Sequence, residues 1–186
     1  MKQRIIILVG IVLASFIGYG IYEVAITRSF SPPDVARYNK NGLEINVDYC
    51  RPFKKGRLLF GDQNTNALEK FGEPWRTGAN EATEISINKD IKFPEGILKA
   101  GKYSIYTVPG EEEWTVAFNE KLDYWGRSIF GSPFDPDLDV LRVKVPIQDI
   151  PEVVEQFTID FEDDNGIVKM LFIWDKTKVV LPIEVA

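Results

Sequence analysis

Apolar and polar side chains alternate along several short stretches of the chain. Over residues 43–49, Leu, Ile, Val and Tyr occupy one side while Glu, Asn and Asp occupy the other, directly after an Asn41-Gly42 turn signal. This period of two is typical of a half-buried strand. Similar patterns predict further strands at residues 83–88, 101–108, 113–119, 140–145, 157–162, 167–174 and 178–185.

Turn residues separate these predicted strands. Pro109-Gly110 marks a hairpin. Asp164-Asn165-Gly166 is a strong tight-turn signal, because Asn and Gly tolerate positive φ angles. The last three predicted strands therefore indicate a β-meander. Two short helices are expected as well, at residues 64–71 and 151–156.

The number and spacing of these elements predict an all-β fold. Eight or nine short strands with few helical segments are typical of a β-sandwich or a partly closed barrel. With 186 residues, 45% of them hydrophobic, the chain is long enough for one core. We expect the β domain over residues 35–186, after a linker over residues 29–34 whose Ser-Pro-Pro cannot continue a helix.

The N-terminus has a different pattern. The 18 residues from Ile5 to Tyr22 carry no charge and would span roughly 27 Å as a helix, close to the hydrocarbon thickness of a bilayer. Residues 1–28 are therefore predicted to be a membrane anchor with the lipid bilayer as its partner. A cleaved signal peptide and a helix of a soluble core are the alternatives, although no convincing cleavage site follows the apolar run.

Basic residues predict the orientation of this anchor. Lys2 and Arg4 precede the apolar run, and Arg28 alone follows it closely. The positive-inside bias then places the N-terminus in the cytoplasm. The expected location is the inner (plasma) membrane of a bacterium, crossed once, with the C-terminal domain in the periplasm or outside the cell.

Composition excludes several classes of function. The formal net charge is −6, and residues 27–186 carry −7 once Lys2, Arg4 and Glu23 are set aside. An acidic domain is a poor match for nucleic acid, whose binding needs phosphate neutralisation. The chain has no histidine, which removes the commonest general base and zinc ligand. Its one cysteine, Cys50, is expected to be a buried, inert thiol, and no cofactor is expected.

Two loop-like stretches combine basic, aromatic and polar residues. Residues 51–57 hold four basic side chains in seven positions, within an otherwise acidic domain. Residues 73–83 read Glu-Pro-Trp-Arg-Thr-Gly-Ala-Asn-Glu-Ala-Thr. Together these loops are predicted to be the recognition surface of the domain.

These motifs are similar to those of a known family. Arg51-Pro52, Phe60-Gly61, the string Trp-Arg-Thr-Gly-Ala-Asn-Glu-Ala-Thr over residues 75–83, Ala-Gly-Lys-Tyr-Ser over 100–104 and Trp125-Gly126 resemble the bacterial DUF2911 family over roughly residues 30–186. The resemblance implies an exported protein. It implies no activity.

Three readings of the loops stay open. Arg76 and Glu81 form a structural ion pair with Asn80 holding the turn, or the loops line a pocket for a small anionic or sugar-like ligand, or Glu81 takes part in catalysis. The ligand-binding candidates are Arg51, Lys55, Arg57, Trp75, Arg76, Asn80, Glu81 and Trp125. Arg binds carboxylates in a fork, and Trp stacks on rings.

The expected function is that of a binding or interaction module, with a small-molecule ligand or an envelope protein as partner. The alternative is a cell-envelope hydrolase that uses Glu81 with Asp123, or with one of residues 111–113, as a second carboxylate. Asp135, Asp137 and Asp139 mimic the start of a calcium loop, but the sixth and twelfth positions do not fit one. No metal site is expected.

Overall fold

The elements of the fold follow one apolar helix. The computed structural model describes residues 2–125, 134–164 and 166–186, without the side chains of residues 3–6, 8, 23 and 24. Its elements are α1 (Lys2–Phe30), β1 (Pro33–Lys40), β2 (Leu43–Cys50), β3 (Phe60–Gly61), β4 (Glu69–Lys70), β5 (Thr83–Ile87), β6 (Ile91–Phe93), β7 (Gly96–Leu98), β8 (Gly101–Val108), β9 (Glu113–Asn119), the 3₁₀ turn Pro136–Leu138, β10 (Asp139–Asp164) and β11 (Ile167–Val185).

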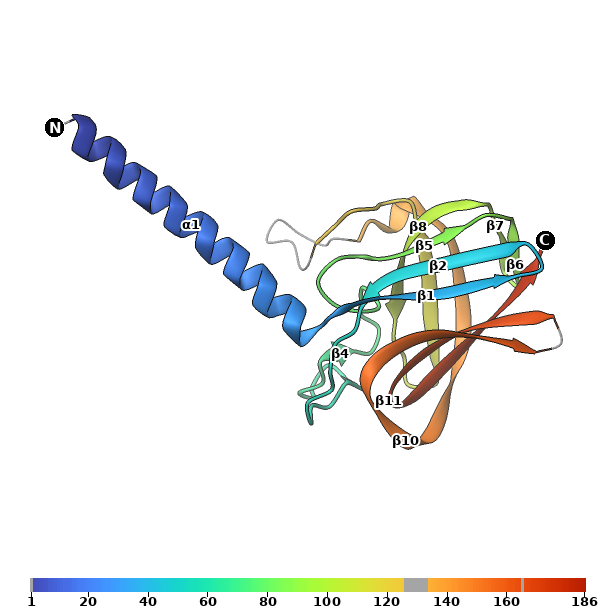
Figure 1. Ribbon diagram of the computed structural model, residues 1–186. Coiled ribbons are helices and arrows are strands. Elements are labelled where there is room, and N and C mark those ends of the chain that lie inside the picture. The colour runs from blue at the N-terminus through green and yellow to red at the C-terminus, as the bar shows by residue number, and fades with distance from the viewer. Residues whose placement is uncertain (1, 126–133, 165) are drawn as a thin grey trace.

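Helix α1 projects away from the sheet (Figure 1). Its stretch Val9–Phe30 is long and apolar enough to cross a membrane, and none of that stretch is buried against protein. The helix ends at Phe30 because Pro32 and Pro33 follow, and the residue before a proline avoids helical dihedrals. Only Ser31 and Pro32 then connect the helix to β1.

The predicted all-β class is confirmed. Nine strands form one antiparallel sheet in the order β1-β2-β5-β8-β9-β10-β11-β6-β7, which is not closed into a barrel within the described ranges. Strands β8 and β9 have the predicted bounds. Asn41 and Gly42 both have positive φ, 54° and 74°, as a two-residue hairpin turn between β1 and β2 requires.

The long ribbon formed by β10 and β11 gives the fold its second layer. The start of β10 pairs with β9, whereas its end pairs only with β11, and the register of that pairing shifts between Asp149 and Thr158. At these shifts the ribbon bends and crosses the face of β1 and β2 (Figure 1). Of the predicted meander, the antiparallel pairing of residues 157–162 with 167–174 is confirmed, but the separate third strand is wrong because residues 167–174 and 178–185 both belong to β11.

The helix predicted at residues 64–71 is also wrong. Backbone bonds to the preceding segment replace the helical ones: Leu68 N donates to Leu58 O at 3.0 Å, and Glu69 N donates to Leu59 O at 2.8 Å. These bonds set strands β3 and β4 side by side in parallel. A segment of eight residues has too little helical stability of its own to compete.

The helix predicted at residues 151–156 is also wrong, because these residues are part of β10. This part of β10 forms backbone hydrogen bonds with the loop after β2: Lys54 N donates to Glu155 O at 2.7 Å, and Phe157 N donates to Pro52 O at 2.9 Å. Pairing with a loop a hundred residues away outweighed the local helical pattern.

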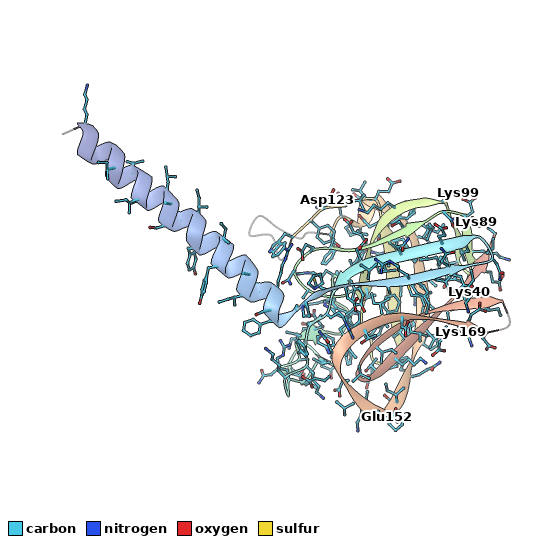
Figure 2. The ribbon with its side chains drawn as sticks, in the orientation of Figure 1. Lys40, Lys89, Lys99, Asp123, Glu152 and Lys169 are labelled. Carbon is cyan, nitrogen blue, oxygen red and sulfur yellow. The ribbon has the colours of Figure 1, made fainter. Side chains whose placement is uncertain are left out.

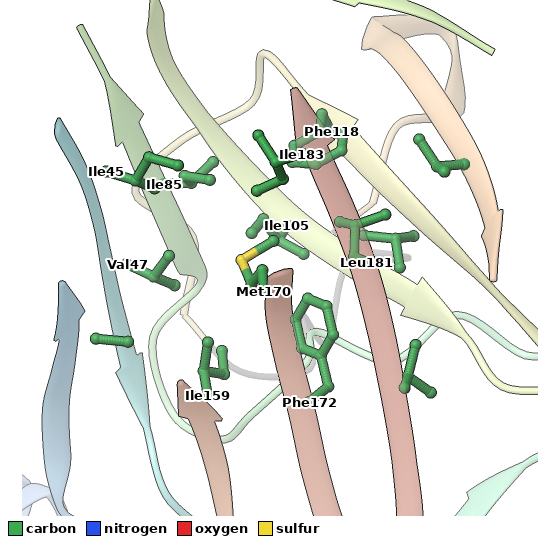
Figure 3. Close-up of a cluster of buried hydrophobic side chains, with 14 of the residues drawn as sticks. Ile45, Val47, Ile85, Ile105, Phe118, Ile159, Met170, Phe172, Leu181 and Ile183 are labelled. Carbon is green, nitrogen blue, oxygen red and sulfur yellow. The ribbon is translucent and has the colours of Figure 1, made fainter. Parts of the chain in front are cut away.

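The core lies between the two layers. Ile45, Val47 and Ile85 from β2 and β5 point at Ile159, Met170 and Phe172 from the ribbon (Figure 3). At one end of this core, aromatic rings replace aliphatic side chains. They belong to Phe60, Trp75, Trp114, Phe157 and Trp174, with centroids 4.9 to 6.1 Å apart for the contacting pairs.

Removing one ring from this cluster should destabilise the domain strongly. Phe157 is fully buried, so Phe157→Ala leaves a cavity and should cost about 3–5 kcal/mol of unfolding free energy. Chemical denaturation of the full chain in detergent, followed by tryptophan fluorescence, measures this. Val153→Ala, at a side chain 54% exposed on the same strand, should change stability by less than about 0.5 kcal/mol. Equal losses in the two variants would contradict this core.

Candidate functional site

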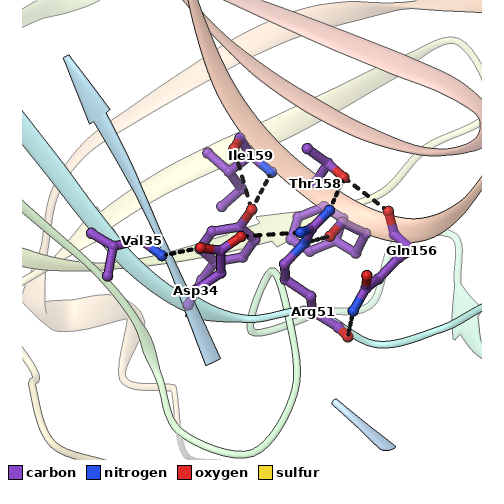
Figure 4. A network of polar contacts seen from close by, with 8 residues as sticks. Asp34, Val35, Arg51, Gln156, Thr158 and Ile159 are labelled. Atoms are coloured by element: carbon purple, nitrogen blue, oxygen red, sulfur yellow. Dashed lines mark hydrogen bonds and ion pairs between the residues drawn. The ribbon is translucent and has the colours of Figure 1, made fainter. Parts of the chain in front are cut away.

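The first predicted loop begins at Arg51, which joins the two layers of the fold (Figure 4). Its guanidinium donates to the carbonyl of Phe157 at 3.0 Å and to the hydroxyl of Thr158 at 2.7 Å, both on β10. It also bonds the carboxylate of Asp34 on β1 at 3.1 Å. With its donors directed at these partners, Arg51 acts as a structural cross-link and lines neither cleft described below.

Residues 54–57 of the same loop form a tight turn that exposes two cations. Lys55 and Gly56 have positive φ, 50° and 69°, and Arg57 N donates to Lys54 O at 3.1 Å. Lys54 is tied to Asp175 at 2.6 Å. The Arg57 guanidinium bonds two carbonyls of the same loop, which holds the side chain in place while leaving it exposed.

The second predicted loop is held in place by backbone pairing with β8 and by a hydrogen bond within the loop. Trp75 pairs with Thr107 on β8, and its indole N–H donates to Gly78 O at 3.0 Å. Gly78 has a φ of 155°, and a Cβ there would lie 2.9 Å from the carbonyl oxygen of Cys50. Thr77 and Asn80 take left-handed φ angles of 57° and 59°. The Thr-Gly-Ala-Asn string therefore encodes a backbone path that passes closely along the end of β2.

The two loops meet at a cavity of about 850 Å³, which we call the first cleft. The buried rings of Trp75 and Trp174 form its floor, together with Phe53. Lys55 and Arg57 line it from the first loop. An aromatic floor with adjacent cations suits a ligand that combines a ring or apolar body with a negative charge.

The remaining wall of the first cleft has mixed charge and includes the helix end. Arg76 lines the cleft together with the carboxylates of Glu69 and Glu73, and Phe30 and Ser31 also belong to the lining. Lys55 Nζ lies 4.0 Å from the centroid of the Phe30 ring, within cation–π range. A ligand in this cleft would therefore touch both loops and the end of α1.

Asn80 and Glu81 do not line the first cleft but bind residues at the end of α1 and directly after it. Asn80, a buried side chain, donates to Ser31 O at 3.1 Å. Glu81 forms an ion pair with Arg28 in the last turn of α1. The sequence reading paired Glu81 with Arg76, whereas the Arg76 guanidinium lies 3.4 Å from the carbonyl oxygen of Asn80. We call the pair of contacts made by Asn80 and Glu81 the helix clasp.

Glu81 also controls the chemistry of Cys50. The thiol donates to the Glu81 carboxylate at 3.1 Å, and burial together with this negative neighbour raises the pKa of Cys50 to about 11. Partial burial by itself would raise the pKa of Glu81, but hydrogen bonds from Arg28 and Cys50 lower it below 4.5. The contribution of this ion pair to stability is therefore complete above pH 4.5 and is lost as the pH falls further.

A second cavity, of about 670 Å³, has Cys50 and Glu81 in its lining. We call it the second cleft. Glu81 and Trp125 line it, and Trp125 is 46% exposed. Asp123, predicted as a second carboxylate for catalysis, lines it too. Of residues 111–113, Glu113 is bound to Lys144 at 2.8 Å, and none of the three belongs to its lining.

The three aspartates that mimic a calcium loop have structural partners. Asp135 caps the 3₁₀ turn through Asp137 N, and Asp139 accepts from Tyr106 at 2.6 Å and from Arg142 at 2.6 Å. Over residues 2–125, 134–164 and 166–186, no group of three or more acidic or thiol side chains is placed to hold a metal ion.

Sequence reasoning missed part of both the cleft and the clasp. Arg28 is visible in the sequence as the first cation after the apolar run, but its partner is 53 positions away. The sequence pattern places Phe30 in the predicted linker and Trp174 at the end of the predicted strand over residues 167–174. Nothing in the local pattern brings these residues to the loops.

The structure thus defines a mostly β domain with an apolar N-terminal helix and two clefts beside the helix end. A model of the family described as protein of unknown function (DUF2911) matches residues 31–183. The chain belongs to the DUF2911 family, as its motifs indicate. Comparisons with curated proteins and with solved structures give no match.

Two substitutions at Asn80 separate the clasp from the backbone strain. Asn80→Gly removes the bond to Ser31 but keeps a residue that accepts positive φ, and should cost about 1 kcal/mol. Asn80→Ala removes the same bond and also places a Cβ at a φ of 59°, which should add about 1–2 kcal/mol. Thermal unfolding of the full chain measures both. Equal stability of the two variants would contradict the left-handed conformation.

The Cys50 thiol should react slowly at neutral pH, because its raised pKa leaves little of the reactive thiolate. With a pKa of about 11, its reaction with a maleimide should be slow at pH 8 and accelerate as the pH approaches 11. Glu81→Gln removes the neighbouring charge and should shift this profile to lower pH. Arg28→Ala opens the clasp but keeps the carboxylate, and should not produce that shift. The same acceleration in both variants would mean that exposure, and not charge, controls the thiol.

Proposed function

We propose that the protein is a membrane-anchored binding module. Helix α1 crosses the inner membrane once with its N-terminus in the cytoplasm, and the β domain lies outside the cytoplasm. In this domain the first cleft binds a small anionic or sugar-like ligand. The observation that carries the proposal is the meeting of the two motif loops around one cavity, with an aromatic floor and cationic side chains beside it.

The arrangement of the cleft supports binding by preorganised groups. Trp75 and Trp174 are buried and stack at 5.7 Å with an interplanar angle of 17°, so their position costs nothing further when a ligand arrives. Arg57 is held by two carbonyls of its own loop. A rigid floor with fixed donors is typical of small-molecule sites.

The alternative proposal is a carboxylate-dependent cell-envelope hydrolase that uses Glu81. The second cleft supports it, because Glu81 and Asp123 share that cavity. However, the lowered pKa of Glu81 keeps this carboxylate ionised at neutral pH, which suits a base or nucleophile but not a general acid. Its oxygens are also engaged by Arg28 and Cys50. We therefore favour binding.

A ligand screen by thermal shift tests the binding proposal. The full chain in neutral detergent is heated with inorganic phosphate, citrate or glucuronate, which supply the negative charge with and without a ring. A ligand present at 100 times its Kd should stabilise the fold by about 2.7 kcal/mol and raise Tm by roughly 5–10 °C. In the double variant Lys55→Ala and Arg57→Ala, affinity should fall by roughly 100-fold or more, because each of the two charged hydrogen bonds is worth about 1.5–3 kcal/mol.

Matched variants identify the cleft. Lys89→Ala removes an exposed cation at the opposite end of the domain (Figure 2) and should leave the shift unchanged. Asp123→Asn alters the second cleft and should leave it unchanged as well. A ligand whose affinity responds to Asp123 but not to Lys55 and Arg57 would move the site to the second cleft and favour the hydrolase.

A further inference from the structure

The first cleft lies at the end of the apolar helix. Phe30 is the last residue of α1, and it lines the cleft together with Ser31. A helix of 29 residues is roughly 43 Å long, which matches a whole bilayer of about 40–45 Å including both headgroup layers. If α1 crosses a membrane upright, its C-terminal end and the cleft beside it therefore lie at the level of the lipid headgroups.

The surface beside the cleft combines cations with exposed apolar side chains. Lys55 and Arg57 are exposed in the tight turn, and Leu58 directly after them is 53% exposed. Phe30 is also 53% exposed, and Leu68, which lines the cleft, is exposed as well. Basic and apolar side chains side by side are typical of surfaces that enter the membrane interface.

This basic surface differs in charge from the rest of the domain, which is acidic. Residues 27–186 carry a formal charge of −7, so the domain as a whole is repelled by an anionic bilayer. Lys40 and Lys89 are exposed at the end of the domain that lies away from α1 (Figure 2), so an upright α1 would keep them away from the membrane. An upright α1 would place the turn with Lys55 and Arg57 at the level where lipid phosphates are concentrated.

We propose that the ligand of the first cleft is the anionic headgroup of a phospholipid from the membrane that α1 crosses. Lys55 and Arg57 bind the phosphate, while Phe30, Leu58 and Leu68 face the boundary between headgroups and acyl chains. The inference rests on the proposed function and names the class of its ligand. A soluble phosphate would offer the same charge, but it would leave these apolar side chains in water.

The test uses the full chain in lipid nanodiscs. Leu58→Cys is labelled with an environment-sensitive fluorophore, and the unsubstituted chain treated in the same way gives the background from Cys50. Nanodiscs contain either phosphatidylcholine alone or phosphatidylcholine with 30% phosphatidylglycerol. In the anionic nanodiscs we expect the emission of the fluorophore to shift to shorter wavelength. Spin-labelled lipid should quench this emission at least about threefold more strongly there than in the neutral nanodiscs.

Charge-reversal variants show whether the cleft is responsible. Removing two basic residues near an anionic surface should weaken the contact roughly 30-fold, so Lys55→Glu with Arg57→Glu should reduce quenching to the level in neutral nanodiscs. The matched control, Lys89→Glu with Lys92→Glu, changes the net charge equally at exposed positions away from the cleft and should leave quenching unchanged. Equal loss in both double variants would overturn the proposal, because only net charge would then matter.

A soluble anion shows whether the cleft binds phosphate at all, independently of whether that phosphate belongs to a lipid. Glycerol phosphate is added to the neutral nanodiscs, and Tm is followed with and without the Lys55 and Arg57 substitutions. If glycerol phosphate stabilises the chain through these residues while phosphatidylglycerol changes nothing, the lipid source is refuted and the anion-binding cleft stands. If neither phosphatidylglycerol nor any soluble anion has an effect that depends on Lys55 and Arg57, both proposals fail.

Discussion

The stacking of Trp75 on Trp174 is the contact on which the rest of the structure depends. Trp75 belongs to the loop over residues 73–83, and Trp174 belongs to the returning half of the β10–β11 ribbon. Trp114 and Phe157 surround the pair, so the rings fill one end of the space between the layers. The burial that holds the ribbon against the sheet also fixes the motif loop. The same rings are the floor of the first cleft.

The family motif has a physical role that does not require a ligand. Gly78 lets the loop pass the carbonyl of Cys50, and Asn80 binds the backbone of Ser31. Glu81 then pairs with Arg28, and Lys55 lies against the ring of Phe30. These contacts tie both loops to the end of α1, across a connection of only two residues. The residues that position the end of the helix thus lie in or next to the two loops that line the first cleft.

Charge is distributed unevenly around the helix clasp. Three cations and two carboxylates line the first cleft, whereas five carboxylates, including Glu81, and one cation line the second among the described residues. Hydrogen bonds from Arg28 and Cys50 lower the pKa of the Glu81 carboxyl, whereas burial, together with the nearby Glu81 carboxylate, raises the pKa of the Cys50 thiol. Glu81 therefore stabilises the end of α1 through Arg28 and adds to the negative charge of the second cleft.

The sequence by itself determined the local features: the apolar helix, the alternation in strands such as β8 and β9, the Asn41-Gly42 turn and the family motifs. These follow from side-chain periodicity and from the dihedral preferences of Gly, Asn and Pro, which act over a few residues. The tertiary structure decided that residues 151–156 extend a bent strand, that Arg28 pairs with Glu81 and that Trp174 enters the cleft. Each of these joins segments distant along the chain, and the free energy of such pairing comes from packing and long-range hydrogen bonds that no local pattern contains.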